Sequence, residues 1–137
     1  MPKKTIAQLK KDPDKVFAAY IRKRDSKDGY FVCISCGQTK TVDQMHAGHF
    51  YARTFTATRW NEANVNGQCA ACNTFKHGNI LEYRKGMLAK YGQDVLDLLE
   101  RDHQANVKLD RESLEFKIGM YKNLQKSPSV HSTHGLG

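Results

Sequence analysis

The sequence has no long hydrophobic run and few acidic residues. No apolar segment approaches the roughly 20 residues that a membrane-spanning helix needs. The chain opens on Met1-Pro-Lys-Lys, a lysine-rich start that does not have the pattern of a signal peptide. We therefore expect a soluble protein of a reducing compartment.

The shortage of acidic residues leaves the chain strongly basic. It has 14 Asp and Glu against 22 Lys and Arg, a formal net charge of +8. Residues 1–30 hold nine basic residues against four acidic ones, residues 31–78 hold four against two, and the remainder holds nine against eight. An excess of this kind favours a polyanion such as nucleic acid as partner, although a solvated lysine face is the alternative reading.

Cysteine is also scarce, and its spacing is informative. The chain has 137 residues, 39% of them hydrophobic, which predicts one domain with a modest core that would benefit from a covalent or metal staple. Its four cysteines form two C-x2-C pairs separated by 32 residues: Cys33, Cys36, Cys69 and Cys72. This pattern predicts a structural Zn²⁺ site with four thiolate ligands. The alternatives are unliganded thiols or two redox pairs, and the βαβ context typical of a thioredoxin-like pair is missing.

The first 29 residues predict a basic helical arm. Thr5 is a candidate cap for a short helix over residues 6–11, and Asp12 followed by Pro13 signals the start of a second, amphipathic helix. A short strand is expected from Tyr30 into the first cysteine pair, and another over residues 45–51.

Helical periodicity predicts three helices after the second cysteine pair. The first ends at Gly92, the second carries Val95, Leu98 and Leu99 on one side, and the third runs from Asp110 to Lys126. We therefore expect one domain over 1–126, made of the arm (1–29), a zinc-knuckle core (30–78) and C-terminal helices (79–126). Residues 127–137 lack apolar periodicity and are expected to be a disordered tail.

The loop between the cysteine pairs holds residues that suit phosphodiester hydrolysis. His46, His49, Arg53 and Asn64 lie inside it, and Asn73 follows Cys72 directly. A histidine can deprotonate a water molecule while a divalent ion stabilises the pentacovalent phosphate and the leaving oxygen. The residue types are thus those of a one-metal nuclease site.

The motifs resemble those of a known family. N-x4-C-x2-C-N with a histidine on the preceding strand resembles the HNH, or ββα-metal, nuclease motif. The strings C-I-S-C-G, A-G-H-F-Y-A-R, R-W-N-E-A-N-V-N-G-Q-C-A-A-C-N and G-N-I-L-E-Y-R resemble the phage NinG/Rap family of recombination proteins. The resemblance runs from about Tyr20 to Arg84. It implies an α+β fold, a small and mainly helical domain built around a zinc-stapled ββα-metal motif.

The resemblance assigns roles by position. His49 would be the general base, Asn64 would hold the loop through backbone hydrogen bonds, and Arg53 would contact the scissile phosphate or its leaving group. Asn73 would be a ligand of the catalytic ion, Mg²⁺ or Mn²⁺. Basic residues expected to contact DNA are Lys23, Arg24, Arg59, Lys76 and His77.

His46 departs from the family pattern, which usually has aspartate at this position. As a second ligand of the catalytic ion, an imidazole would favour manganese, zinc, nickel or cobalt over magnesium. Alternatively, His46 does not bind the ion, and Asp43 or a water molecule completes the coordination.

The function that the resemblance implies is metal-dependent endonucleolytic cleavage of branched DNA, such as Holliday junctions and D-loops, in phage recombination. The protein would be phage-encoded and act in the cytoplasm of the bacterial host. Cutting opposed strands implies a homodimer, for which the apolar faces of the C-terminal helices are the expected interface. Two alternatives stay open: a non-catalytic zinc-knuckle protein that binds DNA as a recombination accessory, and an HNH nicking or homing-type nuclease.

Overall fold

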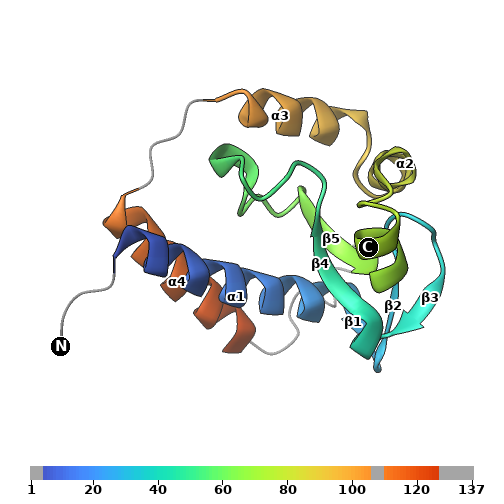
Figure 1. Cartoon of the computed structure of the whole chain (residues 1–137), viewed down its shortest axis with the longest axis horizontal. Helices are drawn as coiled ribbons and strands as arrows, with labels where there is room; N and C mark the ends of the chain where they lie inside the picture. The colour runs from blue at the N-terminus through green and yellow to red at the C-terminus, as the bar shows by residue number, and fades with distance from the viewer. Residues whose placement is uncertain (1–4, 106–109, 127–137) are drawn as a thin grey trace.

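The computed structural model describes residues 5–105 and 110–126 and shows a small α+β arrangement of helices and two sheets (Figure 1). The helices are α1 (Ile6–Asp25), α2 (Ile80–Tyr91), α3 (Gln93–His103) and α4 (Arg111–Lys126). The strands are β1 (Ser26–Lys27), β2 (Tyr30–Val32), β3 (Thr39–Thr41), β4 (Met45–His49) and β5 (Val65–Cys69). Short helical turns are η1 (Val42–Gln44), η2 (Thr56–Thr58) and the π-helical turn η3 (Ala71–Phe75). The predicted tail over 127–137 lies outside the described residues.

The N-terminal arm is one helix, which corrects the prediction of two. Thr5 caps α1 with a capping box, in which its hydroxyl accepts from the Gln8 amide at 3.2 Å and its own amide donates to Gln8 Oε1 at 2.8 Å. Pro13 is buried inside the helix instead of beginning a new one. An internal proline costs about 3 kcal/mol, but packing of Phe17 and Ile21 in the core offsets that cost. None of the helices in the described ranges is long and apolar enough to cross a membrane.

Two antiparallel sheets form the centre of the chain. β1, β2 and β3 make the first, and β4 pairs with β5 in the second, with Met45 opposite Cys69 and His49 opposite Val65. The strands expected at Tyr30 and Met45 are therefore confirmed, although β4 ends at His49. All five residues of β5 are buried, and two of them are polar. Its sequence therefore lacks the alternation of apolar and polar residues that predicts a strand with one exposed face.

The three C-terminal helices lie where the prediction places them, but the buried face of α3 is formed by Leu96 and Leu99, and Leu98 is exposed. Gly92, at φ +89°, ends α2, and Asp110 accepts a hydrogen bond from the Ser113 amide at 2.8 Å at the start of α4. α4 lies along α1, and the ring centroids of Tyr121 and Phe17 are 4.8 Å apart (Figure 1). The buried face of α4 is thus covered by α1 of the same chain, so it is not available as the expected dimer interface.

The core is divided among three clusters. One joins α1 and α4 around Trp60, a second surrounds the cysteines with Phe31 and Met45, and a third joins α2 and α3 through Tyr83 and Leu99. The β4–β5 hairpin lies between them. This places both ends of the hairpin against packed elements, which holds the candidate site residues on rigid supports.

Candidate functional site

The four cysteines converge as their spacing predicts. Their Sγ atoms all lie within 4.8 Å of one another, and those of Cys36 and Cys69 are 3.9 Å apart. A tetrahedral zinc ion with bonds of about 2.3 Å separates its sulfur ligands by about 3.8 Å. The cluster can therefore hold a metal such as zinc.

The surroundings of Cys33 favour a thiolate there. The amides of Cys69 and Cys36 donate to its Sγ at 3.3 and 3.5 Å. Burial alone would raise the pKa of the Cys33 thiol, but these backbone hydrogen bonds outweigh it and lower the pKa to about 7. Burial raises the pKa of the Cys36 and Cys72 thiols, so the surrounding hydrogen bonds stabilise a thiolate at Cys33 but not at these two.

His49 lies at the end of β4 with its imidazole oriented by the backbone. Its Nε2 lies 2.8 Å from the carbonyl oxygen of Arg59. A carbonyl oxygen can only accept, so Nε2 carries the hydrogen, and Nδ1 of the neutral ring keeps its lone pair. Burial lowers the pKa of His49, which favours this neutral form near pH 7. The geometry therefore suits a proton acceptor.

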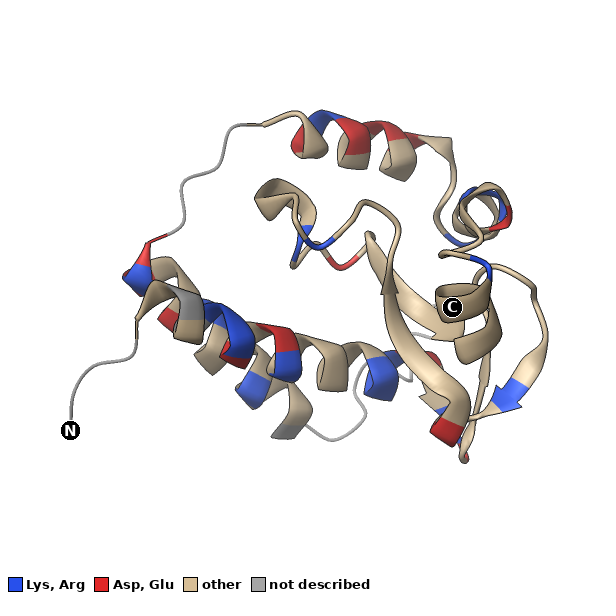
Figure 2. Ribbon diagram, viewed as in Figure 1, with Lys and Arg blue, Asp and Glu red and all other residues tan. Residues whose placement is uncertain are grey.

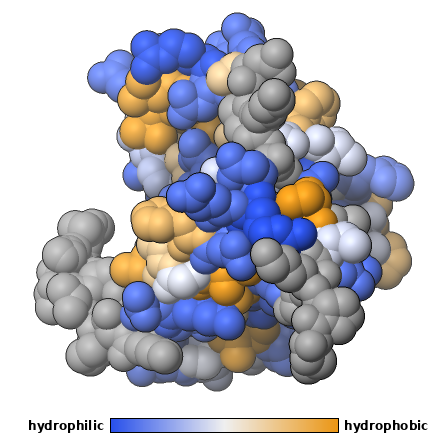
Figure 3. All heavy atoms as spheres, turned by 90° about the vertical axis from the view of Figure 1, so that its left-hand side faces the viewer, coloured by the Kyte–Doolittle hydropathy of each residue, from blue (hydrophilic) through white to orange (hydrophobic). Residues whose placement is uncertain are grey.

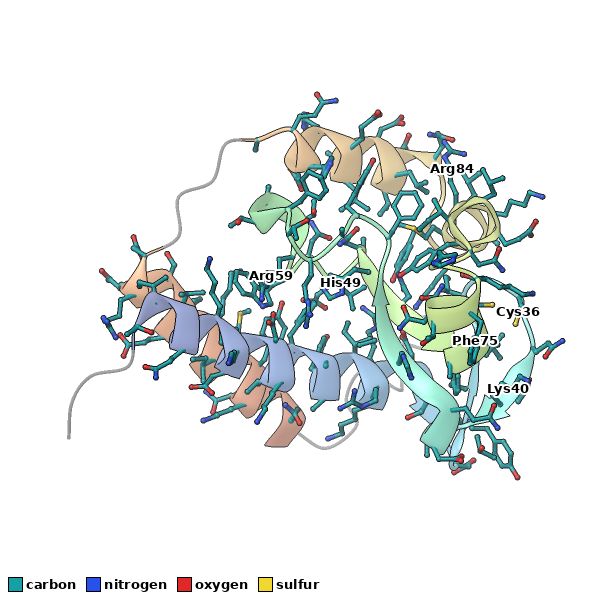
Figure 4. The ribbon with its side chains drawn as sticks, in the orientation of Figure 1. Cys36, Lys40, His49, Arg59, Phe75 and Arg84 are labelled. Carbon is teal, nitrogen blue, oxygen red and sulfur yellow. The ribbon has the colours of Figure 1, made fainter. Side chains whose placement is uncertain are left out.

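A cavity of about 360 Å³ brings three of the predicted site residues together. His49, Arg53 and Asn73 line it along with Asp14 of α1, and the remaining lining residues are Phe17, Ala18, Ala47 and Val65. Figure 4 shows His49 and Arg59 side by side above α1, well apart from Cys36. The cysteine cluster and the histidine cavity are thus separate sites that flank the same hairpin.

Asn64 forms the hydrogen bonds that its position in the motif implies. Its side chain is fully buried, and Nδ2 donates to the carbonyl oxygens of Tyr51 and Thr58, both at 3.0 Å. Its Oδ1 accepts from the Tyr51 amide at 2.8 Å. One side chain therefore ties together the two ends of the loop that follows His49.

His46 and Asn73 contact each other. Asn73 lies on η3 just after Cys72, and its Nδ2 is 2.8 Å from His46 Nδ1. His46 is not among the residues that line the cavity, because residues three apart on a strand project from opposite faces. In the described part of the chain, the cysteines are the only group of three or more His, Cys, Asp or Glu side chains placed to share an ion. A second ion at His46 and Asn73 would need further ligands from other residue types or solvent.

Two of the five residues expected to bind DNA are engaged inside the fold. Arg24 donates to the Asp25 carboxylate at 2.7 and 2.8 Å and to the carbonyl oxygen of Val65 at 2.9 Å. Arg59 pairs with the carboxylate of Asp14, with Nε 2.9 Å from Oδ1. These contacts give both guanidinium groups a structural role and argue against the expected DNA contacts.

The other three occupy more open positions. Lys76 and His77 are exposed on the turn after η3, and His77 has a positive φ of 49°. Lys23 is exposed, with Nζ 2.6 Å from the carbonyl oxygen of Gln125 on α4. Figure 2 shows acidic residues among the basic ones along α1, so the arm is not a uniformly basic helix.

Sequence reasoning missed two carboxylates, Asp14, which lines the cavity, and Asp25, which supports the fold outside it. Asp25 accepts from the Gly67 amide at 2.8 Å and from Lys90 at 3.2 Å, which joins α1 to β5 and α2. Asp14 follows a proline, and in the sequence it reads only as part of a helix-start signal. Apart from Arg24, which is adjacent to Asp25, these partners are 42 to 65 residues away in the chain, so no local pattern could have revealed them.

Comparisons with known proteins find one family whose model covers the described region and relatives that match part of it. The family described as Bacteriophage Lambda NinG protein matches residues 2–129. Protein ninG of Escherichia phage lambda is 42% identical over 88 residues, which are 62% of this chain and 40% of that protein. Protein ninG of Enterobacteria phage H19B is 36% identical over 110 residues, 78% of this chain and 52% of that protein. Protein ninG of Salmonella phage P22 is 40% identical over 89 residues, 63% of this chain and 41% of that protein.

The chain spans about half or less of the length of these relatives. No solved structure matches it.

Proposed function

The chain belongs to the bacteriophage lambda NinG family, and on this basis we propose that it is a metal-dependent endonuclease that hydrolyses phosphodiesters in branched DNA. The observation that carries the proposal is the cavity in which His49, held as a neutral base, faces the same space as Arg53 and Asn73. Phosphodiester hydrolysis uses a base to activate water and positive charge to stabilise the phosphate. His49 would supply the base and Arg53 the positive charge, and the side-chain amide of Asn73 offers an oxygen ligand for a divalent ion.

The proposed reaction begins with proton transfer to His49. Nδ1 accepts a proton from a water molecule whose oxygen forms a bond to phosphorus, and the bond from phosphorus to the ester oxygen breaks. Arg53 stabilises the negative charge on the phosphate, and solvent supplies the proton that the leaving oxygen takes up. Asn64 holds the loop after β4 so that His49 and Arg53 keep their relative positions.

His46 and Asn73 are the residues that would hold a catalytic Mg²⁺ or Mn²⁺. An imidazole nitrogen and an amide oxygen are suitable donors for such an ion. The present contact joins Asn73 Nδ2 to His46 Nδ1, so a bound ion would replace this hydrogen bond and take the Asn73 oxygen as its ligand. A bound ion would supply electrostatic stabilisation of the pentacovalent phosphate and the leaving oxygen. A structural zinc ion on the four cysteines would keep η3, and with it Asn73, against the hairpin.

Cleavage of a branched substrate on opposed strands also favours a homodimer. The buried face of α4 is covered by α1, so a second copy would use other surfaces. Figure 3 shows one face of the molecule, where hydrophilic residues cover much of the surface and apolar residues form separate patches. Exposed Leu98 of α3 and Phe116 of α4 offer apolar contacts for a small interface.

The test compares wild type with His49→Ala on four-way junction, nicked and linear duplex DNA in the presence of Mg²⁺ or Mn²⁺. We expect preferential junction cleavage by wild type and a loss of roughly 10²- to 10⁴-fold in the variant. Junction binding in EDTA and the zinc content, both unchanged in the variant, control for folding.

Equal cleavage by both proteins would show that His49 is not the base. Salt-sensitive binding by wild type without turnover in any divalent ion would instead support the DNA-binding accessory alternative. Equal cutting of linear duplex at defined sequences would support the nicking or homing alternative.

A further inference from the structure

We propose that Asp14, on α1, is a positioning residue that fixes the imidazole of His49 through the backbone of Arg59. The inference rests on the proposed nuclease function, which assigns His49 as the base. Asp14 lies 35 residues before His49 in the chain and outside the cysteine-bounded loop, so it extends the working site to the N-terminal helix.

Both oxygens of the Asp14 carboxylate are used. Oδ1 accepts from Arg59 Nε at 2.9 Å and from the indole Nε1 of Trp60 at 3.1 Å, and Oδ2 accepts from Arg59 Nη2 at 2.5 Å. The side chains of Asp14 and Arg59 are each only 17% exposed. A two-point pair of this kind restricts orientation as well as distance.

These contacts hold the peptide that orients His49. Trp60 is 5% exposed and packs in the same cluster as Phe17 of α1, while the Arg59 guanidinium lies 5.2 Å from the centre of its ring. Residues 59 and 60 are therefore tied to α1 by side chains on two successive positions. The Arg59 carbonyl oxygen, 2.8 Å from His49 Nε2, belongs to this restrained segment. Figure 4 shows Arg59 and His49 next to each other on the side of the loop that faces α1.

Charge adds a second effect. Asp14 lines the same cavity as His49, as does Arg53. Its negative charge favours a protonated imidazole, whereas the positive charges of Arg53 and Arg59 disfavour one, and burial disfavours it most. Asp14 would thus stabilise the imidazolium that forms when His49 takes the proton from water, which is the role of a carboxylate near a histidine base.

The alternative is that the ion pair only stabilises the fold. A purely structural role predicts that loss of Asp14 lowers thermal stability and reduces activity equally whether or not His49 is present. A positioning role predicts an effect on turnover that passes through His49. The two therefore differ in quantities other than stability.

The variants are Asp14→Asn, which removes the charge and the two-point pairing, and Asp14→Glu, which restores both. Asp97→Asn is the matched control, since Asp97 accepts a hydrogen bond from Gln93 on the exposed surface of α3. Each is made in the wild-type and His49→Ala backgrounds. Junction cleavage kinetics and ¹⁵N NMR of the histidine rings are recorded for each folded protein.

We expect Asp14→Asn to lower kcat about 10- to 100-fold with little change in KM, and Asp14→Glu to recover part of it. Asp14→Asn should cause no further loss in the His49→Ala background. In the NMR spectra, the Nε2–H tautomer of His49 should give way to a mixture. Asp97→Asn should resemble wild type.

Equal losses in the two backgrounds, or an unchanged His49 tautomer with unchanged kcat, would overturn the inference. If Asp14→Asn does not fold, Arg59→Lys, which keeps the backbone carbonyl but not the two-point pair, provides the same comparison. The NMR result does not depend on cleavage. A changed tautomer in a protein that cuts no DNA would therefore refute the proposed function while supporting the positioning of His49 by Asp14.

Discussion

The side-chain amide of Asn64 pairs with the backbone of Tyr51 in both directions, accepting from its amide at 2.8 Å and donating to its carbonyl at 3.0 Å. This is the pairing that a neighbouring strand would provide, supplied instead by one side chain. It holds the chain immediately after β4, at the point where Phe50 also donates its amide to the Asn64 carbonyl at 2.9 Å. The loop that carries Arg53 is thereby anchored without regular secondary structure.

Asn64→Ala should therefore destabilise the protein markedly. The change removes three hydrogen bonds of a fully buried side chain and leaves the Tyr51 amide and carbonyl without their Asn64 partner, while the Thr58 carbonyl keeps the Asn61 amide. We therefore expect a loss of about 2–4 kcal/mol in the free energy of unfolding. Asn61→Ala is the matched control, because Asn61 makes one side-chain bond, to the Ala63 amide at 2.9 Å, and its loss should cost about 1 kcal/mol. Urea unfolding monitored by the fluorescence of Trp60, the single tryptophan, measures both. Similar losses in the two variants would contradict the special role of Asn64.

Removal of zinc should unfold the part of the chain around the cysteines. The cluster of Phe31 and Met45 is built on Cys33, Cys69 and Cys72, whereas the cluster between α1 and α4 contains no cysteine. Chelation should therefore abolish the packing of the first cluster while part of the helical circular dichroism signal persists.

Metal analysis should find about one zinc per chain in wild type and less in Cys72→Ser. Re-addition of zinc should restore the chelated wild type but not the variant. An unchanged spectrum and melting temperature after complete removal of zinc would refute a structural site.

The pH dependence of cleavage should show an acidic limb below about 6.5, the ordinary pKa of histidine. Burial lowers the pKa of His49, so the ring stays neutral and able to accept a proton further into the acidic range. Activity is lost only as pH falls through this lowered pKa.

Stability should change over the same pH range and with the same sign. The unfolded chain begins to bind a proton at His49 near pH 6.5, whereas the folded protein does so only at lower pH, so His49 makes folding less favourable as pH falls below about 6.5. Rate profiles and urea unfolding between about pH 5 and 8, which brackets the ordinary histidine pKa, measure both effects. A rate limb centred above pH 6.5 would contradict the assignment.

His46→Asp should shift the metal preference of cleavage towards magnesium. A carboxylate oxygen is a harder donor than an imidazole nitrogen and suits Mg²⁺, so the ratio of activity in Mg²⁺ to activity in Mn²⁺ should rise several-fold. The measurement is junction cleavage over matched titrations of the two ions. No change in this ratio would indicate that His46 is not a ligand, as in the alternative with Asp43 or water.

Loss of charge should affect stability strongly at Arg24 and only weakly at Lys76. Arg24→Gln breaks a pair in which Arg24 and Asp25 are 18% and 10% exposed, so we expect a loss of about 2–4 kcal/mol in stability. Lys76→Gln removes an exposed charge and should change stability by less than about 0.5 kcal/mol.

The affinity for junction DNA tests whether Lys76 contacts the substrate. Lys76→Gln should weaken binding and reduce the slope of log affinity against log salt by about 1, as expected for one lost phosphate contact. An unchanged salt slope would remove Lys76 from the DNA-binding surface.

Local patterns in the sequence predicted much of this structure. The C-x2-C spacing predicted the convergence of four thiols, because each pair closes a short turn whose geometry is set by a few residues. Gly92 marked the end of α2, since a positive φ is readily adopted by glycine. Motif positions also drew attention to Asn64, Asn73 and His46, and the last two contact each other, while their role as ligands of a catalytic ion stays a prediction.

Other features depended on contacts between distant segments. Pro13 reads as a helix start, yet α1 continues through it because packing against α4 outweighs one lost hydrogen bond. Arg24 and Arg59 read as DNA contacts, but carboxylates and carbonyls brought close by folding bind them.

Composition and short-range spacing thus determined which residues could bind metal or accept a proton, since those properties belong to side chains and local turns. Folding determined which of them share a space. Asp14 reaches Arg59 across 45 residues, and through Arg59 the imidazole of His49, only because α1 packs beside the hairpin.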